Sequence, residues 1–528
     1  METPVFSRAA VAAPHHAAAR AGKAVLAEGG DAIEAMLAMA AAIAVVYPHM
    51  NSIGGDAFWL IREPAGRVRY IEACGFAGAR ATIESYRAQG HAYIPRRGAG
   101  AALTVPGAVG GWALAHAFSQ ARGGKLPLKA LLHDAIGLAR EGFPQSASEA
   151  RLKLREIDAL EAAPGFAQTF YVDGKRAGAG AVRRFEKLGA ALAHLAEAGL
   201  EDFYRGDVGR EIAADLAAIG APVVREDLER YRAVMREPLA LKLPGRTLYN
   251  APPPTAGLAS LALLGIFERL GVKRAESFEH IHGLVEASKQ SFVVRNRACV
   301  DYDMKREDPE GFLVSAGLQR MADAIDMKRA APWPLPPGDG DTIWMGAIDG
   351  DGLAVSYIQS IFWDYGSGCV LPQTGVLLQN RGVSFSLDAK NPNALAPGKR
   401  PMHTLNPPLC VFDDGRVLSY GAMGGDGQPQ FQAQVMTRFM FGAGLADAID
   451  APRFRYDKSW RAGRATLKLE DRFDPSIVSA LEKAGHEIET HPGPYDDSFG
   501  HAGGLLRHPG GRIEAAHDPR ADGGAEGI

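Results

Sequence analysis

Hydrophobic and polar positions alternate in blocks along the N-terminal region, and each block predicts one element. Residues 14–47 are apolar at helical spacing with a Gly-Gly break at 29–30, which predicts two helices, the second capped by Asp31. The apolar run 57–61 is typical of a buried strand. The run 70–73 follows after a short turn and predicts an antiparallel partner for that strand.

The rest of the chain reads as a helical middle followed by hairpins and further helices. From about 109 to 325, Ala, Leu, Glu and Arg recur at helical spacing. Two pairs of apolar runs then flank Asp/Gly-rich turns, which predicts β-hairpins at 343–348 with 353–361 and at 408–412 with 417–420. Helices are predicted again near 428–441, 445–451 and 474–485, before a final pair of short strands. This order favours antiparallel sheets covered by helices over a parallel βαβ repeat.

A segment rich in proline and glycine, residues 331–341, separates the helical middle from the first hairpin. Because proline removes a backbone donor and fixes φ, this segment is expected to be an exposed loop, neither helix nor central strand. Thr342 follows directly and opens the predicted strand. From spacing alone, the favoured interpretation of Thr342 is an ordinary β-branched residue at a strand start.

Composition and charge exclude several classes of protein. The chain has 528 residues, 47% hydrophobic and 23% charged, which excludes a disordered, collagen-like or coiled-coil protein. Lys and Arg total 58 against 61 Asp and Glu, so the net charge is −3 and provides no field for a phosphate backbone or an anionic membrane. We therefore expect neither a nucleic-acid nor a membrane partner.

The cysteines and the apolar segments predict a cytoplasmic protein. The 4 cysteines are far apart, without a CxxC pair, and are expected to be buried thiols in a reducing compartment. The N-terminus lacks the unbroken apolar run of a signal peptide, and the longest apolar stretch, 35–47, is shorter than the ~20 residues that span a bilayer.

No cofactor or metal is expected from the motifs. His486 and His491 have one residue too many between them for a helical zinc site, and their alternating surroundings predict an edge strand. His280 and His282 lack cysteine or carboxylate partners in the local sequence and are expected to be structural. Dinucleotide, phosphate-loop and serine-elbow motifs do not occur in the chain.

From residue 341 onward the sequence resembles the γ-glutamyltransferase family. The stretch DTIWMGAIDGDGLAVS at 341–356 is similar to the start of the small subunit in that family. Further matching segments follow the family's order, at 29–32, 54–58, 105–107, 252–257, 400–407, 424–425 and 451–454. The resemblance covers nearly the whole chain.

The resemblance implies an N-terminal-nucleophile hydrolase with a four-layer αββα fold of the α+β class. It further implies that the precursor cuts itself between Asp341 and Thr342, which leaves a large fragment of 1–341 and a small fragment of 342–528 that stay associated. A threonine hydroxyl is a weak nucleophile until a base removes its proton. Cleavage creates that base, because a free α-amino group has a pKa of ~7.7–8.0 and is partly neutral near pH 7.

The family pattern also implies roles for other residues. Gly424 and Gly425 match the glycines of the oxyanion hole, where backbone N–H groups stabilise the tetrahedral intermediate; a plain turn before the next helix is the alternative. Ser360 matches a hydroxyl residue that hydrogen-bonds the nucleophile, and the alternative is a solvated strand position. His403 and Thr404 occupy the place of a serine pair that contacts the acid end of the substrate.

The sequence departs from the family where the α-centre of a glutamyl substrate would bind. Cys74, Phe362 and Ser384 stand in place of an arginine, an asparagine and an aspartate of the family. Without a bidentate arginine contact, the binding free energy of a substrate carboxylate should be weaker by about a few kcal/mol, roughly the contribution of a charge-assisted pair. Arg381 is a nearby cation that could hold the carboxylate of a smaller acid amide, the alternative being a surface or interchain ion pair. This pattern resembles the family branch that includes oxamate amidohydrolases.

We therefore expect a self-processing amidohydrolase that acts through an acyl-enzyme and hydrolyses a small acid amide such as oxamate. The alternatives are a true γ-glutamyltransferase or glutathione hydrolase, a glutaryl or cephalosporin acylase, and an unprocessed relative that only binds its ligand. The expected partners are the amide substrate and the two fragments with each other. A homodimer or a heterotetramer of fragments stays open.

Overall fold

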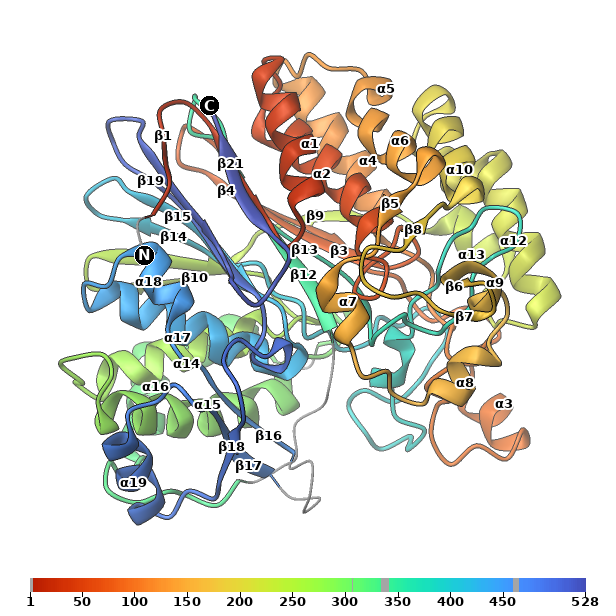
Figure 1. The fold of residues 1–528 in the computed structure, drawn as a ribbon. Coiled ribbons are helices and arrows are strands. Elements are labelled where there is room, and N and C mark those ends of the chain that lie inside the picture. The colour runs from red at the N-terminus through yellow and green to blue at the C-terminus, as the bar shows by residue number, and fades with distance from the viewer. Residues whose placement is uncertain (1–2, 306, 334–340, 459–464) are drawn as a thin grey trace.

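Two antiparallel sheets lie face to face at the centre of the molecule, and helices cover the outer side of each (Figure 1). The computed structural model describes residues 3–305, 307–333, 341–458 and 465–528. The layers follow the order helix, sheet, sheet, helix, so the expected αββα sandwich of the α+β class is confirmed.

The first sheet has 7 strands in the order β1-β20-β19-β15-β14-β11-β10. These are β1 (Val5–Phe6), β10 (Leu239–Leu243), β11 (Arg246–Asn250), β14 (Leu409–Phe412), β15 (Val417–Ala422), β19 (Ala502–Arg507) and β20 (Ile513–His517). Its outer face is covered by α14 (Gly257–Arg269), α17 (Gln428–Met440) and α18 (Leu445–Asp450), with α15 (Phe278–Ala298) and α16 (Ser315–Asp323) packed beyond them.

The second sheet also has 7 strands, in the order β21-β2-β12-β13-β3-β4-β9. These are β2 (Ala10–Ala13), β3 (Asp56–Arg62), β4 (Val68–Ala73), β9 (Val234–Arg236), β12 (Asp341–Ile348), β13 (Ala354–Phe362) and β21 (Gly524–Gly527). Helices α1 (His16–Ala27), α2 (Ala32–Val46) and α4 (Ala108–Ala121) pack on its outer face.

Shorter elements surround this sandwich. The helices are α3 (Ile83–Ala88), α5 (Leu128–Leu131), α6 (His133–Glu141), α7 (Ala147–Arg151), α8 (Ile157–Glu161), α9 (Phe166–Phe170), α10 (Glu186–Ala198), α11 (Asp202–Arg205), α12 (Asp207–Ile219), α13 (Arg225–Arg230) and α19 (Pro475–Lys483). The strands are β5 (Phe143–Pro144), β6 (Tyr171–Val172), β7 (Lys175–Arg176), β8 (Val182–Arg183), β16 (Phe454–Lys458), β17 (Ala465–Glu470) and β18 (Ile488–His491).

Helix α2 shows how local sequence and burial agree in this fold. Asp31 accepts hydrogen bonds from the backbone N–H groups of Ile33 and Glu34, and the Glu34 carboxylate accepts one from the Asp31 N–H. This capping box begins the helix where the sequence predicts it. Every residue of α2 is buried, which explains why the helix is almost entirely apolar rather than amphipathic.

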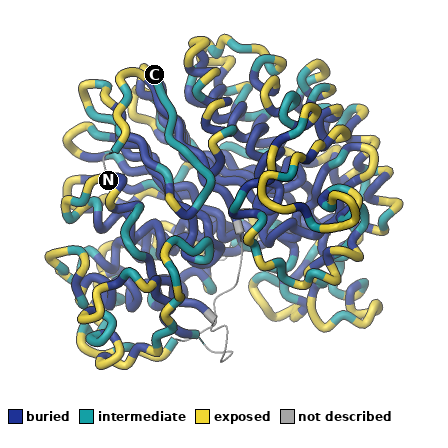
Figure 2. Tube along the Cα trace, in the orientation of Figure 1, coloured by how far each residue is buried: buried dark blue, intermediate teal, exposed yellow. Residues whose placement is uncertain are grey.

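The space between the two sheets is filled by large side chains that meet glycines. Trp344 of β12 is buried against Gly421 of β15 and Gly503 of β19, where a Cβ atom would collide with the indole ring. Its indole Nε1 donates a hydrogen bond to Ser356 Oγ at 2.9 Å. The continuous dark interior of Figure 2 reflects this close packing of the two sheets.

Strands from before and after residue 342 alternate within both sheets. In the second sheet, β12 and β13 lie between β2 and β3, and in the first sheet β14 pairs with β11. Each part of the chain therefore satisfies the backbone hydrogen bonds of the other, and neither could bury its strand edges alone.

The structure confirms most predicted elements and corrects one region. The two hairpins, β12 with β13 and β14 with β15, and the helices α17 to α19 occur where the pattern predicts them. The middle of the chain is less helical than expected, because β10 and β11 form a hairpin that the analysis missed. The signal was present in the sequence: leucine occupies every second position of 239–243, before a Pro-Gly turn, and these leucines are the buried residues of β10.

Several other expectations can be compared with the described residues. All 4 cysteines are free and buried, as expected. Of the predicted exposed loop, residues 334–340 lie outside the described part of the chain, and Asp341 is already the first residue of β12. Among the residues described, no helix combines the length and the apolar character needed to cross a bilayer.

Candidate active site

Thr342 is fully buried near the start of β12. The register of β12 against β13 shifts between Asp341 and Ile343, so the strand is irregular at Thr342. The Thr342 Oγ1 donates a hydrogen bond to Ser360 Oγ at 3.3 Å and accepts one from Gln428 Nε2 at 3.2 Å. The hydroxyl of the expected nucleophile is therefore held in a defined orientation by groups from β13 and α17.

The end of β13 turns sharply beside this hydroxyl. Ser360 Oγ accepts a hydrogen bond from the Phe362 N–H at 2.8 Å. Phe362 has a φ of +81°, which side chains other than glycine rarely adopt, and such strain is often found at functional sites. The turn places the Phe362 ring 3.9 Å from the guanidinium carbon of Arg381, so the residue that replaces the family asparagine supports a cation instead.

Arg381 is only 1% exposed and lies in the 3₁₀ helix Arg381–Ser384. Its Nη1 donates a hydrogen bond to Thr404 Oγ1 at 3.4 Å, whereas its Nη2 has no hydrogen-bond partner among the described residues. Burial lowers its pKa to about 9, and the charges of Asp56 and Asp426 oppose that shift. A surface ion pair, which the sequence left open for Arg381, is therefore wrong.

A chain of hydrogen bonds connects Arg381 to the nucleophile. Asn406 Nδ2 donates to the Thr404 backbone oxygen at 2.9 Å and to Gln428 Oε1 at 3.3 Å. Gln428 in turn donates to Thr342, and Thr404 accepts from Arg381. The expected acid-binding residues and the expected nucleophile thus belong to one buried polar cluster.

Asp56 and His403 form the opposite side of this cluster. Asp56 pairs directly with Ser360 across β3 and β13, and its Oδ2 lies 3.4 Å from His403 Nε2. The Asp56 Oδ1 accepts hydrogen bonds from Gly75 N, Gly107 N and Gln379 Nε2 at 2.9, 3.1 and 3.0 Å. Burial nevertheless raises the pKa of Asp56 to about 7, and burial lowers the pKa of His403 well below its usual value.

Gly424 and Gly425 follow β15 and lead into α17. Both have positive φ, +124° and +53°, and a Cβ atom on Gly424 would come within 2.5 Å of the Phe431 ring. Glycine is therefore required by the backbone at Gly424. The turn that the sequence left as an alternative is present, and it starts the helix whose first residue, Gln428, contacts Thr342.

A surface cavity of about 630 Å³ lies beside this cluster. It is lined in part by Ser384, which ends the 3₁₀ helix of Arg381, and by Arg295. Arg295 Nη1 forms an ion pair at 2.7 Å with Asp426 Oδ1, next to Gly425. The cavity is therefore linked to the segment of Arg381 through Ser384 and to the residue after Gly425 through Arg295.

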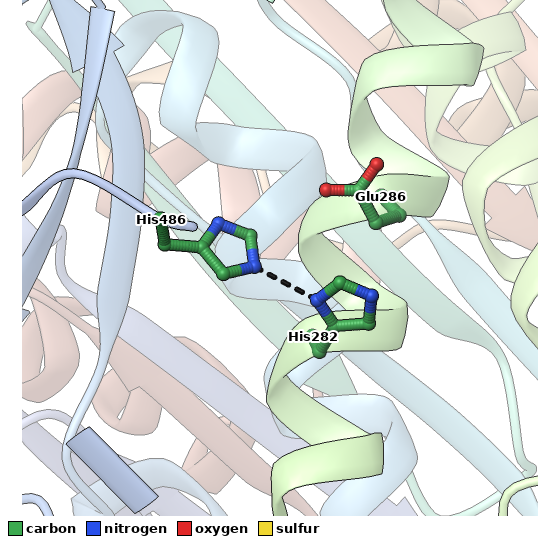
Figure 3. A group of neighbouring side chains, drawn as sticks. All are labelled: His282, Glu286 and His486. Atoms are coloured by element: carbon green, nitrogen blue, oxygen red, sulfur yellow. Dashed lines mark hydrogen bonds between the residues drawn. The ribbon is translucent and has the colours of Figure 1, made fainter. Parts of the chain in front are cut away.

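One group of side chains elsewhere has the composition of a metal site. His282, Glu286 and His486 place ligand atoms within 4.8 Å of one another (Figure 3). In the structure, His282 Nδ1 and His486 Nε2 share a hydrogen bond of 2.8 Å. Lys289 Nζ lies 2.6 Å from Glu286 Oε1 and supplies a cation to that carboxylate. Protein groups therefore already hold this cluster together.

The sequence analysis missed three residues of the polar cluster. Gln428 was seen only as a helix start and Asn406 only as part of a motif, and neither was given a role. Asp56 likewise lies within the matching segment 54–58, where it was given no role. The glycines before Asp56 were the available signal. Gly55 lacks a side chain, which lets the Ser360 backbone approach closely, and Asp56 therefore lies opposite Ser360 in the sheet.

Comparisons with known proteins agree with this geometry. The family model described as gamma-glutamyltranspeptidase matches residues 18–528. The oxamate amidohydrolase proenzyme of Klebsiella pneumoniae subsp. pneumoniae is 47% identical over 517 residues, which cover 98% of this chain and 97% of that protein. A glutathione hydrolase-like proenzyme of Bacillus subtilis is 35% identical, with 98% of each chain covered.

The solved structures lead to the same result. The cephalosporin acylase from Bacillus halodurans matches with a TM-score of 0.91 and 31% identity, covering 100% of this chain and 97% of that one. The resemblance found in the sequence is therefore confirmed. The chain belongs to the γ-glutamyltranspeptidase family, whose members are enzymes that act on amide C–N bonds and are made as self-cleaving proenzymes.

Proposed function

We propose that this chain cuts itself between Asp341 and Thr342 and then hydrolyses a small acid amide, with oxamate as the first candidate, to the acid and ammonia. The fragments 1–341 and 342–528 would remain associated, because strands of both alternate in each sheet. Oxamate is named because the proenzyme from Klebsiella pneumoniae, 47% identical to this chain, carries that substrate in its name.

In the proposed reaction, the Thr342 Oγ1 attacks the amide carbonyl and its own α-amine takes the proton. The amine then passes the proton to the leaving nitrogen, so that ammonia departs and an acyl-enzyme remains. Water, deprotonated by the same amine, resolves the acyl-enzyme. Ser360 and Gln428 orient the hydroxyl, and the backbone N–H groups of Gly424 and Gly425 are the proposed donors to the oxyanion.

The observation that carries the choice of substrate is the buried Nη2 of Arg381. A buried guanidinium N–H without a protein partner is costly, and a carboxylate would satisfy it with a charge-assisted hydrogen bond. Phe362 stacks on the same guanidinium and occupies the position of the family asparagine. Cys74, which stands where the family has its glutamyl-binding arginine, is buried and contributes no cation. The cluster therefore favours a small monoanionic amide over a glutamyl α-centre.

The test is ammonia release from a panel of amides, combined with a denaturing gel. Wild type should show two fragments and hydrolyse oxamate in preference to γ-glutamyl-p-nitroanilide and glutaryl amides. Thr342→Ala should remain one 56.1 kDa chain and be inactive, whereas the matched Thr342→Ser variant keeps a hydroxyl and should still be cut. Turnover of the γ-glutamyl or glutaryl compounds alone would refute the substrate. A persistently intact wild-type chain without activity would favour a binding protein.

A further inference from the structure

Four buried polar atoms without hydrogen-bond partners among the described residues belong to three residues that interact electrostatically with one another. They are Arg381 Nη2, Asp56 Oδ2 and both ring nitrogens of His403. Buried polar groups are nearly always paired, so a group of unpaired ones marks a place where a ligand completes the hydrogen bonding. Under the proposed function, Arg381 binds the carboxylate end of the acid amide. His403 is expected from the family pattern to contact that acid end, whereas Asp56 has no role in that mechanism.

We propose that Asp56 is a specificity-determining residue of the acid-binding site. When an anionic amide binds to Arg381, Asp56 takes up a proton from solvent. The protonated Asp56 then orients His403 as a second hydrogen-bond donor to the substrate carboxylate. The proposal rests on the proposed function, because it requires an anion at Arg381. According to this proposal, Asp56 and His403 determine whether the enzyme prefers negatively charged or uncharged amides.

The hydrogen-bonding capacity of the pair supports this assignment. Asp56 Oδ1 is fully used by its three N–H donors, so only Oδ2 can face His403. An ionised Oδ2 would accept from His403 Nε2–H and leave Nδ1 as a lone pair, which repels a carboxylate. A protonated Oδ2 can donate to Nε2 instead, and the imidazole then carries its proton on Nδ1 as a hydrogen-bond donor. The 3.4 Å separation permits either arrangement after a small adjustment.

Charge balance points in the same direction. Among the charged groups around Arg381, Asp56 acts on it most strongly, so the Asp56 carboxylate is its main counter-charge within the protein. A bound anion takes over that role and places a second negative charge near Asp56. Like charges in a buried site raise the pKa of a carboxyl group. Burial already raises the pKa of Asp56 to about 7, so uptake of a proton is accessible near neutral pH.

The other titratable side chains around Asp56 do not change charge in this range, in contrast to the Thr342 α-amine of the processed enzyme, which titrates at ~7.7–8.0. Cys74 at the end of β4, Tyr204 of α11 and Tyr231 after α13 are buried, and burial raises the pKa of each well above its usual value. The pKa of His403 is lowered by burial and by Arg381, so it stays neutral. Arg381, with a pKa of about 9, is the remaining candidate at alkaline pH.

The experiment measures kcat and KM for oxamate on the processed enzyme between pH 6 and pH 9. In wild type, KM should rise about tenfold per pH unit above pH 8, because only the protonated Asp56 form binds the anion. Asp56→Asn keeps the Oδ1 acceptor and mimics the protonated acid, so its KM should lose this slope. Oxamide, the neutral analogue of oxamate, should show no such slope with wild type.

The matched control is Asp349→Asn. Asp349 is also a buried carboxyl with a raised pKa, about 6, and accepts backbone N–H bonds, but it lies at the opposite end of β12. This variant should keep the wild-type KM profile. A slope that persists in Asp56→Asn would assign it to Arg381 and overturn the proposal, as would a flat wild-type profile. Absence of all acid-amide turnover by wild type would instead refute the proposed function, and this proposal with it.

Discussion

Replacing Arg381 with methionine should remove the recognition of the substrate's acid group and leave self-cleavage intact. Methionine fills most of the buried volume above the Phe362 ring without a charge. The hydrogen bonds of Thr342 Oγ1 with Ser360 and Gln428 involve no atom of Arg381. The variant should therefore still be cut into two fragments.

The size of the effect follows from the donors that are lost. A carboxylate at Arg381 would receive up to two charge-assisted hydrogen bonds, each contributing about 1.5–3 kcal/mol. Losing both should cost about 3–6 kcal/mol, which corresponds to a roughly 10²- to 10⁴-fold fall in kcat/KM for oxamate. Arg381→Lys keeps the charge but loses the planar stacking on Phe362, so its loss should be smaller.

The assay is ammonia release from oxamate and from oxamide, which differ in one charge. The ratio of kcat/KM for the two amides should collapse in Arg381→Met, because only oxamate presents a carboxylate. An equal fall for both amides would show that Arg381 acts by maintaining the structure. An unchanged kcat/KM for oxamate would refute the carboxylate site itself.

Four further outcomes are expected. Gly424→Ala forces a side chain into a positive-φ position against Phe431 and should lower kcat on the order of 10²- to 10³-fold, measured by ammonia release on whatever fraction is processed. Below about pH 7.7, kcat/KM for oxamate should fall about tenfold per pH unit, because the Thr342 α-amine must be neutral; a flat acid limb would contradict its role as base. Asp31→Ala removes the cap of α2 and should lower the free energy of unfolding by about 1 kcal/mol in denaturant titrations, with activity unchanged per folded molecule. Arg453 and Arg520 hold the pKa of Asp518 below its usual value, so this carboxylate stabilises the fold above pH ~4 and the gain is lost on acidification; Asp518→Asn should flatten that acid dependence of the melting temperature.

Much of the fold could be predicted from local sequence, whereas the expected nucleophile was singled out by the resemblance to the family. The cap at Asp31, the Asp/Gly turn after 343–348 and the Gly-Gly pair at 424–425 each set the backbone through neighbouring residues alone. The strand opened by Thr342 was located in the same way. The β10 and β11 hairpin was missed although its alternation is local, because the surrounding helical composition outweighed a five-residue signal.

The polar cluster around Thr342 depends on tertiary structure. Gln428, Asn406 and Asp56 reach it from α17, from the segment before β14 and from β3, at sequence separations that no local pattern encodes. The same holds for Arg381, whose buried position over Phe362 depends on how its 3₁₀ helix meets the end of β13. The sequence by itself determined most of the elements, because backbone propensity acts between neighbours, and its resemblance to the family pointed to Thr342 as the expected nucleophile. Only the folded structure decided which buried groups are left without partners, because pairing depends on what distant segments bring to the same place.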